Sequence, residues 1–146
     1  MKKFLLSLAM TVAAVFGAAA ADTFAHDASV LPEAARATIA SNFKSKVSIV
    51  KIDKDCGRIS EYEVILTDGS EIDFDRAGNW KNVETNRSVS VPSGFILKPI
   101  QDFVKAKHSG TKVVGIEKKR SGYDIELNNG VDLKFDADGK FLKYDD

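Results

Sequence analysis

The feature that most constrains this chain is an internal repeat, because residues 62–84 align without gaps with residues 123–145. Six residues are identical between the two segments: Tyr62, Leu66, Gly69, Phe74, Asp75 and Gly78 recur as Tyr123, Leu127, Gly130, Phe135, Asp136 and Gly139. Self-similarity of this kind indicates one supersecondary unit that is written twice. We therefore predict two equivalent units, which span residues 30–84 and 91–146.

Each unit is predicted to begin with a helix. In the first unit, an apolar residue recurs every four positions, at Leu31, Ala35, Ile39 and Phe43. The matching stripe of the second unit contains Ile96, Ile100, Phe103 and Val104. Pro32 suits the first position of the first helix, whereas Pro99 prevents one smooth helix from Ser93. We expect the second helix to span residues 99–107.

Strands are predicted to follow the helix in both units. Residues 47–53 and 112–118 are rich in valine and isoleucine, which favours strands. Tyr62, Val64 and Leu66 then alternate with more polar residues, as expected for a half-buried strand.

Glycine-containing turns are predicted to connect these strands. Asp68-Gly69 and its counterpart Asn129-Gly130 predict tight hairpins in which both turn residues have positive φ. Longer hairpin loops are expected at residues 75–79 and 136–140. The fourth strands then carry two aromatic residues at equivalent positions, Trp80 and Phe141. Exposed, these aromatics would anchor a partner, and buried, they would close the ends of the core.

We therefore expect an α+β fold made of two tandem helix-plus-four-stranded antiparallel meander units, with the helices packed on one sheet face. A unit of about 55 residues without disulfides is marginally stable alone. Cys56 is the only cysteine and cannot form a disulfide within the chain. The two units are thus predicted to share one core, in a single domain over residues 30–146.

The N-terminal residues are predicted to be a signal peptide over residues 1–21. Lys2 and Lys3 precede an apolar run over residues 4–17, and four alanines follow, so cleavage is expected before Asp22. The run is shorter than the roughly 20 residues of a membrane-spanning helix, and the lack of a cysteine near the cleavage point argues against a lipoprotein. We predict a periplasmic or secreted protein whose mature N-terminus, residues 22–29, is flexible.

Charge and residue types exclude several function classes. Without residues 1–21 the chain has 19 basic and 21 acidic residues, a net charge of about −2, which argues against a nucleic-acid ligand. His26 and His108 are the only histidines, and with the lone cysteine they match neither a catalytic triad nor a zinc site. We expect no catalytic residues and no cofactor, and hence no enzyme.

The loop sequences FDRAGN and FDADGK raise the question of calcium, because they place oxygen ligands around a glycine. An EF-hand-like frame puts Lys134 at the first position of one loop and Ala77 at the fifth position of the other, and neither side chain binds a cation. Turn formation explains the aspartates without a metal. We therefore predict no metal site in these loops.

The alternation also predicts what the face opposite the helices carries. Ten residues are assigned to it: Glu63, Ile65, Thr67, Glu71, Asp73, Asp124, Glu126, Asn128, Asp132 and Lys134. Such an acidic surface favours a partner that carries basic residues. The alternative is the ordinary solvated side of an antiparallel sheet.

The repeated pattern resembles the β-lactamase-inhibitor-like, PepSY-like family of bacterial exported proteins. The segments that carry the resemblance are LPEAARATIASNF with YEVILTDGSEIDFDRAGNW, and VPSGFILKPIQDFV with YDIELNNGVDLKFDADGKF. The resemblance covers residues 30–144 and implies tandem units whose helices cover one face of the sheet. In the inhibitor that gives the family its name, the open face binds a β-lactamase, and related modules are associated with restraining peptidases.

These observations favour a non-enzymatic binding module that recognises an as yet unidentified protein or peptide through the open sheet face, and that in this way restrains an enzyme. The alternative is a small-ligand or metal-ion carrier of the cell envelope. We expect the protein to be a monomer.

Overall fold

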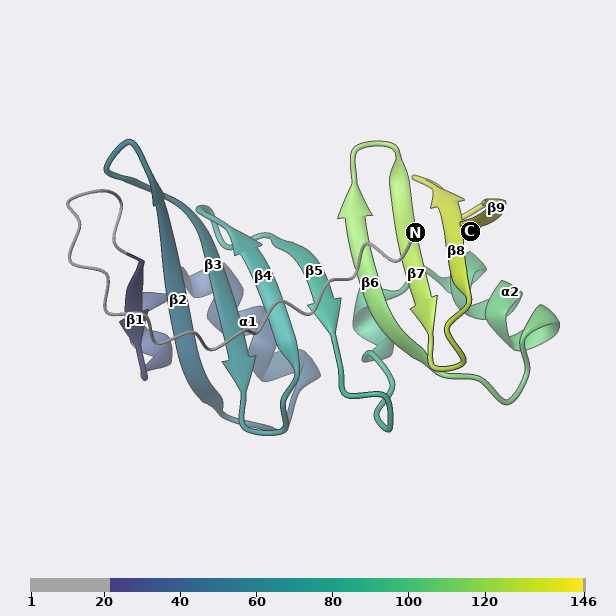
Figure 1. Cartoon of the computed structure of the whole chain (residues 1–146), viewed down its shortest axis with the longest axis horizontal. Helices are drawn as coiled ribbons and strands as arrows, with labels where there is room; N and C mark the ends of the chain where they lie inside the picture. Colours follow the sequence, from purple (N-terminus) through teal and green to yellow (C-terminus); the bar gives the residue numbers. More distant parts are fainter. Residues whose placement is uncertain (1–21, 146) are drawn as a thin grey trace.

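The computed structural model describes residues 22–145, which form a nine-stranded antiparallel sheet with two α-helices on one of its faces (Figure 1). The strands follow one another across the sheet in chain order, from β1 at one edge to β9 at the other. The fold is therefore a mixed α/β architecture with an open antiparallel sheet. The predicted signal peptide, residues 1–21, lies outside the described residues.

The nine strands are β1 (Thr23–Ala25), β2 (Val47–Asp55), β3 (Arg58–Leu66), β4 (Glu71–Asp75), β5 (Trp80–Glu84), β6 (Val113–Lys119), β7 (Gly122–Leu127), β8 (Asp132–Asp136) and β9 (Phe141–Asp145). Strands β2 to β5 follow the first α-helix, and strands β6 to β9 follow the second. Each strand pairs with the next strand in the chain, including β5 with β6, so the sheet is continuous from one half of the chain to the other.

Both predicted helices are present, each with ten residues. Helix α1 (Glu33–Asn42) begins directly after Pro32, and helix α2 (Lys98–Lys107) has a proline in its first turn. Short 3-10 helices precede them, η1 (Ala28–Val30) and η2 (Ser93–Phe95). No helix in the described part of the chain is long and apolar enough to cross a membrane.

The tight hairpins differ from the prediction in their backbone conformation. Gly69 and Gly130 have φ of 86°, but the preceding residues, Asp68 and Asn129, do not have positive φ. The Leu66 N–H donates to the Ser70 carbonyl at 2.8 Å, so three residues lie between the two bonded residues instead of the two residues of the predicted turn. The longer loop lets the acidic or amide residue accept a backbone N–H, while only the glycine adopts the left-handed conformation.

The glycines of the loops that precede β5 and β9, Gly78 and Gly139, each lie against the start of a helix. A Cβ atom on Gly78 would lie 2.9 Å from Pro32 Cβ and 3.0 Å from the Ala35 nitrogen. A Cβ atom on Gly139 would lie 3.2 Å from Pro99 Cβ. The recurring glycine therefore permits close packing of the loop against the helix, in addition to its positive φ.

One hydrophobic cluster includes residues from both halves of the chain. Phe95 is buried between them, because its ring centroid lies 5.8 Å from that of Phe43 and 5.2 Å from that of Trp80. Trp80 is half-buried in this contact, and Phe141 is half-buried where it stacks on Phe103 with ring centroids 4.4 Å apart. Both aromatics thus pack at the margin of the core.

The segment at residues 22–29, which the sequence predicts to be flexible, contains β1 and the start of η1. Strand β1 pairs with β2 over three residue pairs, and Asp27 caps η1 by accepting the Ser29 N–H at 2.7 Å. The sequence did not indicate β1, because a strand of three residues gives little periodic signal and its partner, β2, lies beyond α1 in the sequence.

Candidate functional site

The sheet face opposite the helices, here called the open face, carries two rows of side chains that cross the strands. From β2 to β9, the first row contains Lys51, Glu63, Asp73, Asn82, Glu117, Asp124, Lys134 and Lys143. The second row contains Ile49, Ile65, Glu71, Glu84, Gly115, Glu126, Asp132 and Asp145. Both rows lie between strand residues that are buried under the helices, as the alternation of a strand requires.

Eight of the ten residues predicted for this face belong to the rows. Glu63, Asp73, Asp124 and Lys134 are in the first row, and Ile65, Glu71, Glu126 and Asp132 are in the second. Thr67 and Asn128 follow the ends of β3 and β7, where their N–H groups donate to the carbonyls of Lys46 and Lys112 at 2.9 Å. The structure thus brings these residues together, and their role in binding stays a prediction.

Lysines balance the carboxylates towards the two ends of the first row. Near β2, the Lys51 Nζ lies 3.0 Å from Asp53 and 3.2 Å from Glu63. In the other half, Lys119 pairs with Asp124, and Lys134 Nζ lies 3.4 Å from Asp145. The carboxylates of these two regions are therefore at least partly neutralised by neighbouring lysines.

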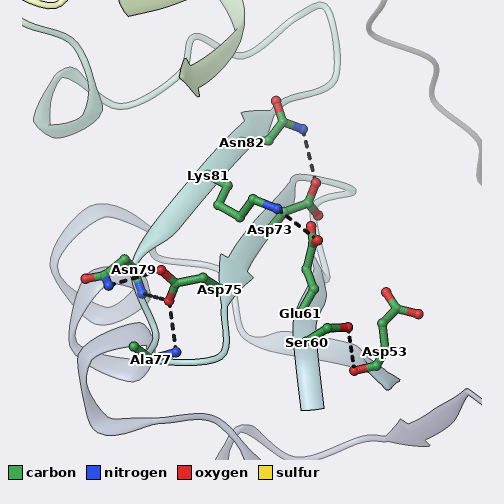
Figure 2. A network of polar contacts seen from close by, with 9 residues as sticks. All are labelled: Asp53, Ser60, Glu61, Asp73, Asp75, Ala77, Asn79, Lys81 and Asn82. Atoms are coloured by element: carbon green, nitrogen blue, oxygen red, sulfur yellow. Dashed lines mark hydrogen bonds and ion pairs between the residues drawn. The ribbon is translucent and has the colours of Figure 1, made fainter. Parts of the chain in front are cut away.

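The centre of the open face has no such balance. Within residues 22–145, Glu71, Asp73 and Glu84 form no ion pair with a basic side chain, and Asp73 accepts only a long 3.4 Å hydrogen bond from Asn82 (Figure 2). Lys81, which lies beside Asp73 in Figure 2, binds Glu61 at 2.9 Å instead. Three neighbouring carboxylates are thus left without an ion-pair partner.

The surroundings of these carboxylates favour their protonated forms. Burial raises the pKa of Asp73 to about 7, and the negative charges of Glu63 and Glu61 add to the effect. Burial likewise raises the pKa of Glu84 to about 7, with contributions from the charges of Glu71 and Glu126 that the positive charge of Arg87 partly offsets. The pKa of Glu71 is also raised, by burial and then by the charge of Glu63. The open face therefore concentrates negative charge at pH values above 7.

Gly115 lies between two buried acids in the second row. Its cross-strand neighbours are Glu84 on β5 and Glu126 on β7, and each of these glutamates is only 7% exposed. Glu126 binds the Arg87 guanidinium at 2.8 Å, whereas the Glu84 carboxylate makes no hydrogen bond within the described residues. Chemically, this arrangement suits an incoming ammonium or guanidinium group.

The family model provisionally named beta-lactamase-inhibitor-like, PepSY-like matches residues 60–143. The chain belongs to this family. No protein with a curated description matches the chain.

Three solved structures of proteins from Bacteroides are similar to the chain over most of its length. One is provisionally described as a periplasmic protein of unknown function from Bacteroides vulgatus, with 40% identity, a TM-score of 0.80, and coverage of 86% of this chain and 100% of its own. Another, from Bacteroides thetaiotaomicron, is provisionally described as calcium-regulated and periplasmic, with 32% identity, a TM-score of 0.77, and coverage of 86% and 97%. A third, also from B. vulgatus, shows 28% identity, a TM-score of 0.76, and coverage of 89% and 100%.

The sequence did not predict every residue of the rows in this PepSY-like sheet. Eight residues of the rows were not assigned to the face: Ile49, Lys51, Asn82, Glu84, Gly115, Glu117, Lys143 and Asp145. Alternation within β5 indicates that Asn82 and Glu84 share a face, but only the pairing of β5 with β6 brings Glu84 beside Gly115. That pairing joins the two halves and has no local signal in the sequence.

The residues considered for catalysis and metal binding lie elsewhere. His26 Nδ1 is 3.2 Å from the Ser48 carbonyl on β2, and His108 Nε2 is 3.2 Å from the Tyr144 hydroxyl on β9, so the two histidines lie towards opposite edges of the sheet. Cys56 is exposed in the β2–β3 hairpin. Between residues 22 and 145, no group of three or more His, Cys, Asp or Glu side chains is arranged to hold a metal ion.

The two FD-loops, residues 74–79 and 135–140, use their aspartates to shape the turn. One Asp75 carboxylate oxygen accepts the N–H groups of Ala77 and Asn79, both at 2.9 Å (Figure 2). The Asp136 carboxylate accepts the N–H groups of Asp138 and Lys140 at 3.0 and 2.8 Å. Although burial opposes the effect, the hydrogen bonds that Asp75 accepts hold its pKa below the usual value.

A shallow groove of about 430 Å³ runs beside α2, lined by Val91, Ile96, Val104, Lys105 and Lys112 among others. It contains no residue of either row. The groove is thus separate from the carboxylates of the open face.

Proposed function

We propose that this PepSY-like protein is a non-enzymatic binding module that recognises a basic protein or peptide through the open face, and that it restrains an enzyme in this way. The observation that carries the proposal is the group of three carboxylates, Glu71, Asp73 and Glu84, which lack an ion-pair partner in the described chain and have raised pKa values. A cationic side chain placed among them would reduce the electrostatic repulsion between these carboxylates and the neighbouring acidic side chains, which is present in the free protein.

The free energy gained from such contact depends on burial. Exposed ion pairs contribute little, about 0–1 kcal/mol each, whereas charged groups shielded from water interact more strongly. Glu84 is only 7% exposed, so a lysine or arginine that reaches it would form a shielded contact. The surrounding acidic side chains would mainly accelerate encounter with a basic partner.

We also propose that the protein is exported, cleaved before Asp22, not lipid-anchored, and monomeric. The similarity to structures provisionally described as periplasmic supports export. We further propose that residues 30–84 and 91–146 are two copies of one unit within a single domain. Matched β-bulges support this, since the β2–β3 pairing shifts between Val47 and Ile49 and the β6–β7 pairing shifts between Val113 and Gly115.

The test compares capture of partners by two charge variants. The face variant, Glu63→Gln with Glu71→Gln, removes two open-face charges, and the control, Glu33→Gln with Asp102→Asn, removes two charges from exposed helix positions. Immobilised wild-type protein and both variants are incubated with envelope extract at low and moderate salt. We expect proteins retained by the wild type to be retained equally by the control and lost from the face variant.

Retained proteins should be basic, and moderate salt should weaken their capture, because charge complementarity is screened by ions. Equal retention by the face variant and the wild type would contradict the proposal. Binding that is lost in both variants would point to the helix side of the molecule instead.

Calcium binding is the second candidate function, favoured by the 32%-identical relative that is provisionally described as calcium-regulated. Oxygen ligands for Ca²⁺ would come from the same central carboxylates, Glu71, Asp73 and Glu84, which would have to move together because the described chain holds no preformed metal site. A calorimetric titration of the wild type and of Glu84→Gln with CaCl₂ separates the candidates. Heat of binding that is present in the wild type and lost in Glu84→Gln supports calcium, and no heat in either protein excludes it.

A further inference from the structure

The sheet ends at β9 with a strand that has a neighbour on one side only. In the described chain β9 pairs with β8, and its other edge is free. Two apolar side chains on this strand are largely exposed, Leu142 at 57% and Tyr144 at 49%. An unpaired edge with exposed apolar residues is a template for pairing with another strand.

The same edge is used inside the molecule, where β5 pairs with β6. Strands β5 and β9 are equivalent in two respects. Each follows a loop that contains a left-handed glycine. Each also pairs with the preceding strand through a register shift at a matching position, between Asp73 and Phe74 on β4 and between Lys134 and Phe135 on β8. Thr85, which follows β5, donates its N–H to the Val114 carbonyl at 2.9 Å. Because N–H groups two residues apart in an extended strand point to the same side, the N–H of Val83 also points towards β6.

The register fixes which residues correspond on the two strands. Val83 lies opposite Ile72 on β4, just as Tyr144 lies opposite Leu133 on β8. Tyr144 is therefore the β9 residue that matches Val83, and its N–H is expected to point towards the free edge.

The complementary edge belongs to β2, the equivalent of β6. The two strands carry the same bulge relative to β3 and β7, which aligns Val50 with Ile116 and Lys51 with Glu117. The edge of β6 is paired with β5, and the matching edge of β2 is paired with the short β1. Ala25 of β1 lies opposite Val50 of β2, just as Val83 of β5 lies opposite Ile116 of β6.

Strand β1 is a weaker cover for its edge than β5 is. Ala25 is only half-buried, whereas its counterpart Val83 is fully buried. Phe24, which precedes Ala25 in β1, is 61% exposed. A three-residue strand at the edge of the sheet also opens more readily than one inside it.

We propose that β1 blocks the β2 edge in the monomer, and that opening of β1 lets the free edge of β9 pair with the β2 edge of a second copy of this chain, in the register that β5 and β6 use. The pairing is head-to-tail, so it extends beyond a dimer unless β1 stays in place. Lys143 of one copy would lie opposite Lys51 of the other, whose charge Asp53 and Glu63 already balance.

The test uses the chain from Asp22 onwards and measures its mass by sedimentation over a range of protein concentrations. Ala25→Pro removes the N–H that the equivalence directs at β2, and Phe24→Pro is the matched control because its N–H points away. We expect the wild type and Phe24→Pro to stay monomeric, and Ala25→Pro to form dimers and larger species.

Three further measurements identify the contact. Adding Tyr144→Pro to Ala25→Pro should restore the monomer, and so should an excess of a synthetic peptide that corresponds to residues 22–29. Adding Lys143→Glu to Ala25→Pro should tighten association about two- to fivefold, since opposite charges would then face each other across the strands. Circular dichroism verifies that each variant is folded.

Two results would overturn the proposal. One is a folded Ala25→Pro protein that stays monomeric at every concentration. The other is self-association that is equally strong in the wild type, because it would mean that β1 does not guard the edge and that another surface is used.

Discussion

Asp73 and Glu84 show how position in a sheet changes the chemistry of an ordinary carboxyl group. Both lie on strands whose alternate residues, Phe74 and Val83, are fully buried, so the carboxyl groups stand close to the protein interior. Other acids lie beside them on neighbouring strands, and burial together with these charges raises both pKa values to about 7. Ionising the pair therefore destabilises the folded protein.

Stability should rise as the pH falls from about 8 to about 5. In the unfolded chain the two carboxyl groups return to their ordinary pKa values of 3.8 and 4.5, so across this range the folded state binds more protons than the unfolded state. The gain is expected to be on the order of 1–2 kcal/mol, since partial exposure moderates the effect. Urea denaturation at a series of pH values measures it.

The variants Asp73→Asn and Glu84→Gln provide the control for this pH dependence. Each should be more stable than the wild type at pH 8 and should show a shallower dependence between pH 5 and 8. An unchanged slope in both variants would show that other groups are responsible.

At the scale of elements, one of the two loop glycines in the first half of the chain packs against a helix and the other does not. Gly69 and Gly78 have nearly the same backbone conformation, with φ of 86° and 90°. Only Gly78 lies against other atoms, since a Cβ atom there would be 3.0 Å from the backbone of α1, whereas Gly69 has open space around it. A side chain at Gly69 would therefore meet only the cost of the left-handed backbone, whereas a side chain at Gly78 would meet that cost and a steric clash with α1 as well.

Replacing each glycine by alanine should give different losses of stability. Gly69→Ala is expected to lower the free energy of unfolding by about 1–2 kcal/mol, the cost of a left-handed alanine. Gly78→Ala should cost about 1–3 kcal/mol more, because α1 has to move away from the loop. Chemical denaturation compares the two, and equal losses would contradict the packing role of Gly78.

At the scale of the whole molecule, Phe95 links the two halves. Its ring lies against Phe43 from the first half and Trp80 at the start of β5, and it is only 3% exposed. The β5–β6 pairing is the other link, and together they make one continuous core.

Phe95→Ala should lower the free energy of unfolding by about 3–5 kcal/mol, as expected for a buried aromatic. Because the residue serves both halves, hydrogen exchange should accelerate in β3 and in β7 alike. Faster exchange that is confined to one half would show that the halves unfold separately.

Local signals in the sequence were sufficient for much of this architecture. The four-residue spacing of Leu31, Ala35 and Ile39 predicts α1, and the alternation around Val64 and Ile125 predicts which side of each strand is buried. These patterns succeed because each reports one periodic contact with the core.

The remaining features depend on contacts between distant segments. The Glu84–Gly115 neighbourhood and the β1–β2 pairing arise only when strands on either side of a helix meet, and nothing local to Gly115 or Thr23 indicates them. The predicted turn at Asp68-Gly69 was wrong for a different reason, since the same dipeptide also suits a longer loop in which only glycine has positive φ.

The chain-order arrangement of the strands has a consequence for how the molecule acquires its shape. Six of the eight strand pairings join neighbours across a short hairpin loop, and only β1–β2 and β5–β6 span a helix. The entropy lost on closing each short loop is small, and contacts between nearby residues form fast. A polypeptide that is synthesised gradually, N-terminus first, can therefore form each half one hairpin at a time. The strand that is synthesised last, β9, is then one of the two edge strands of the sheet.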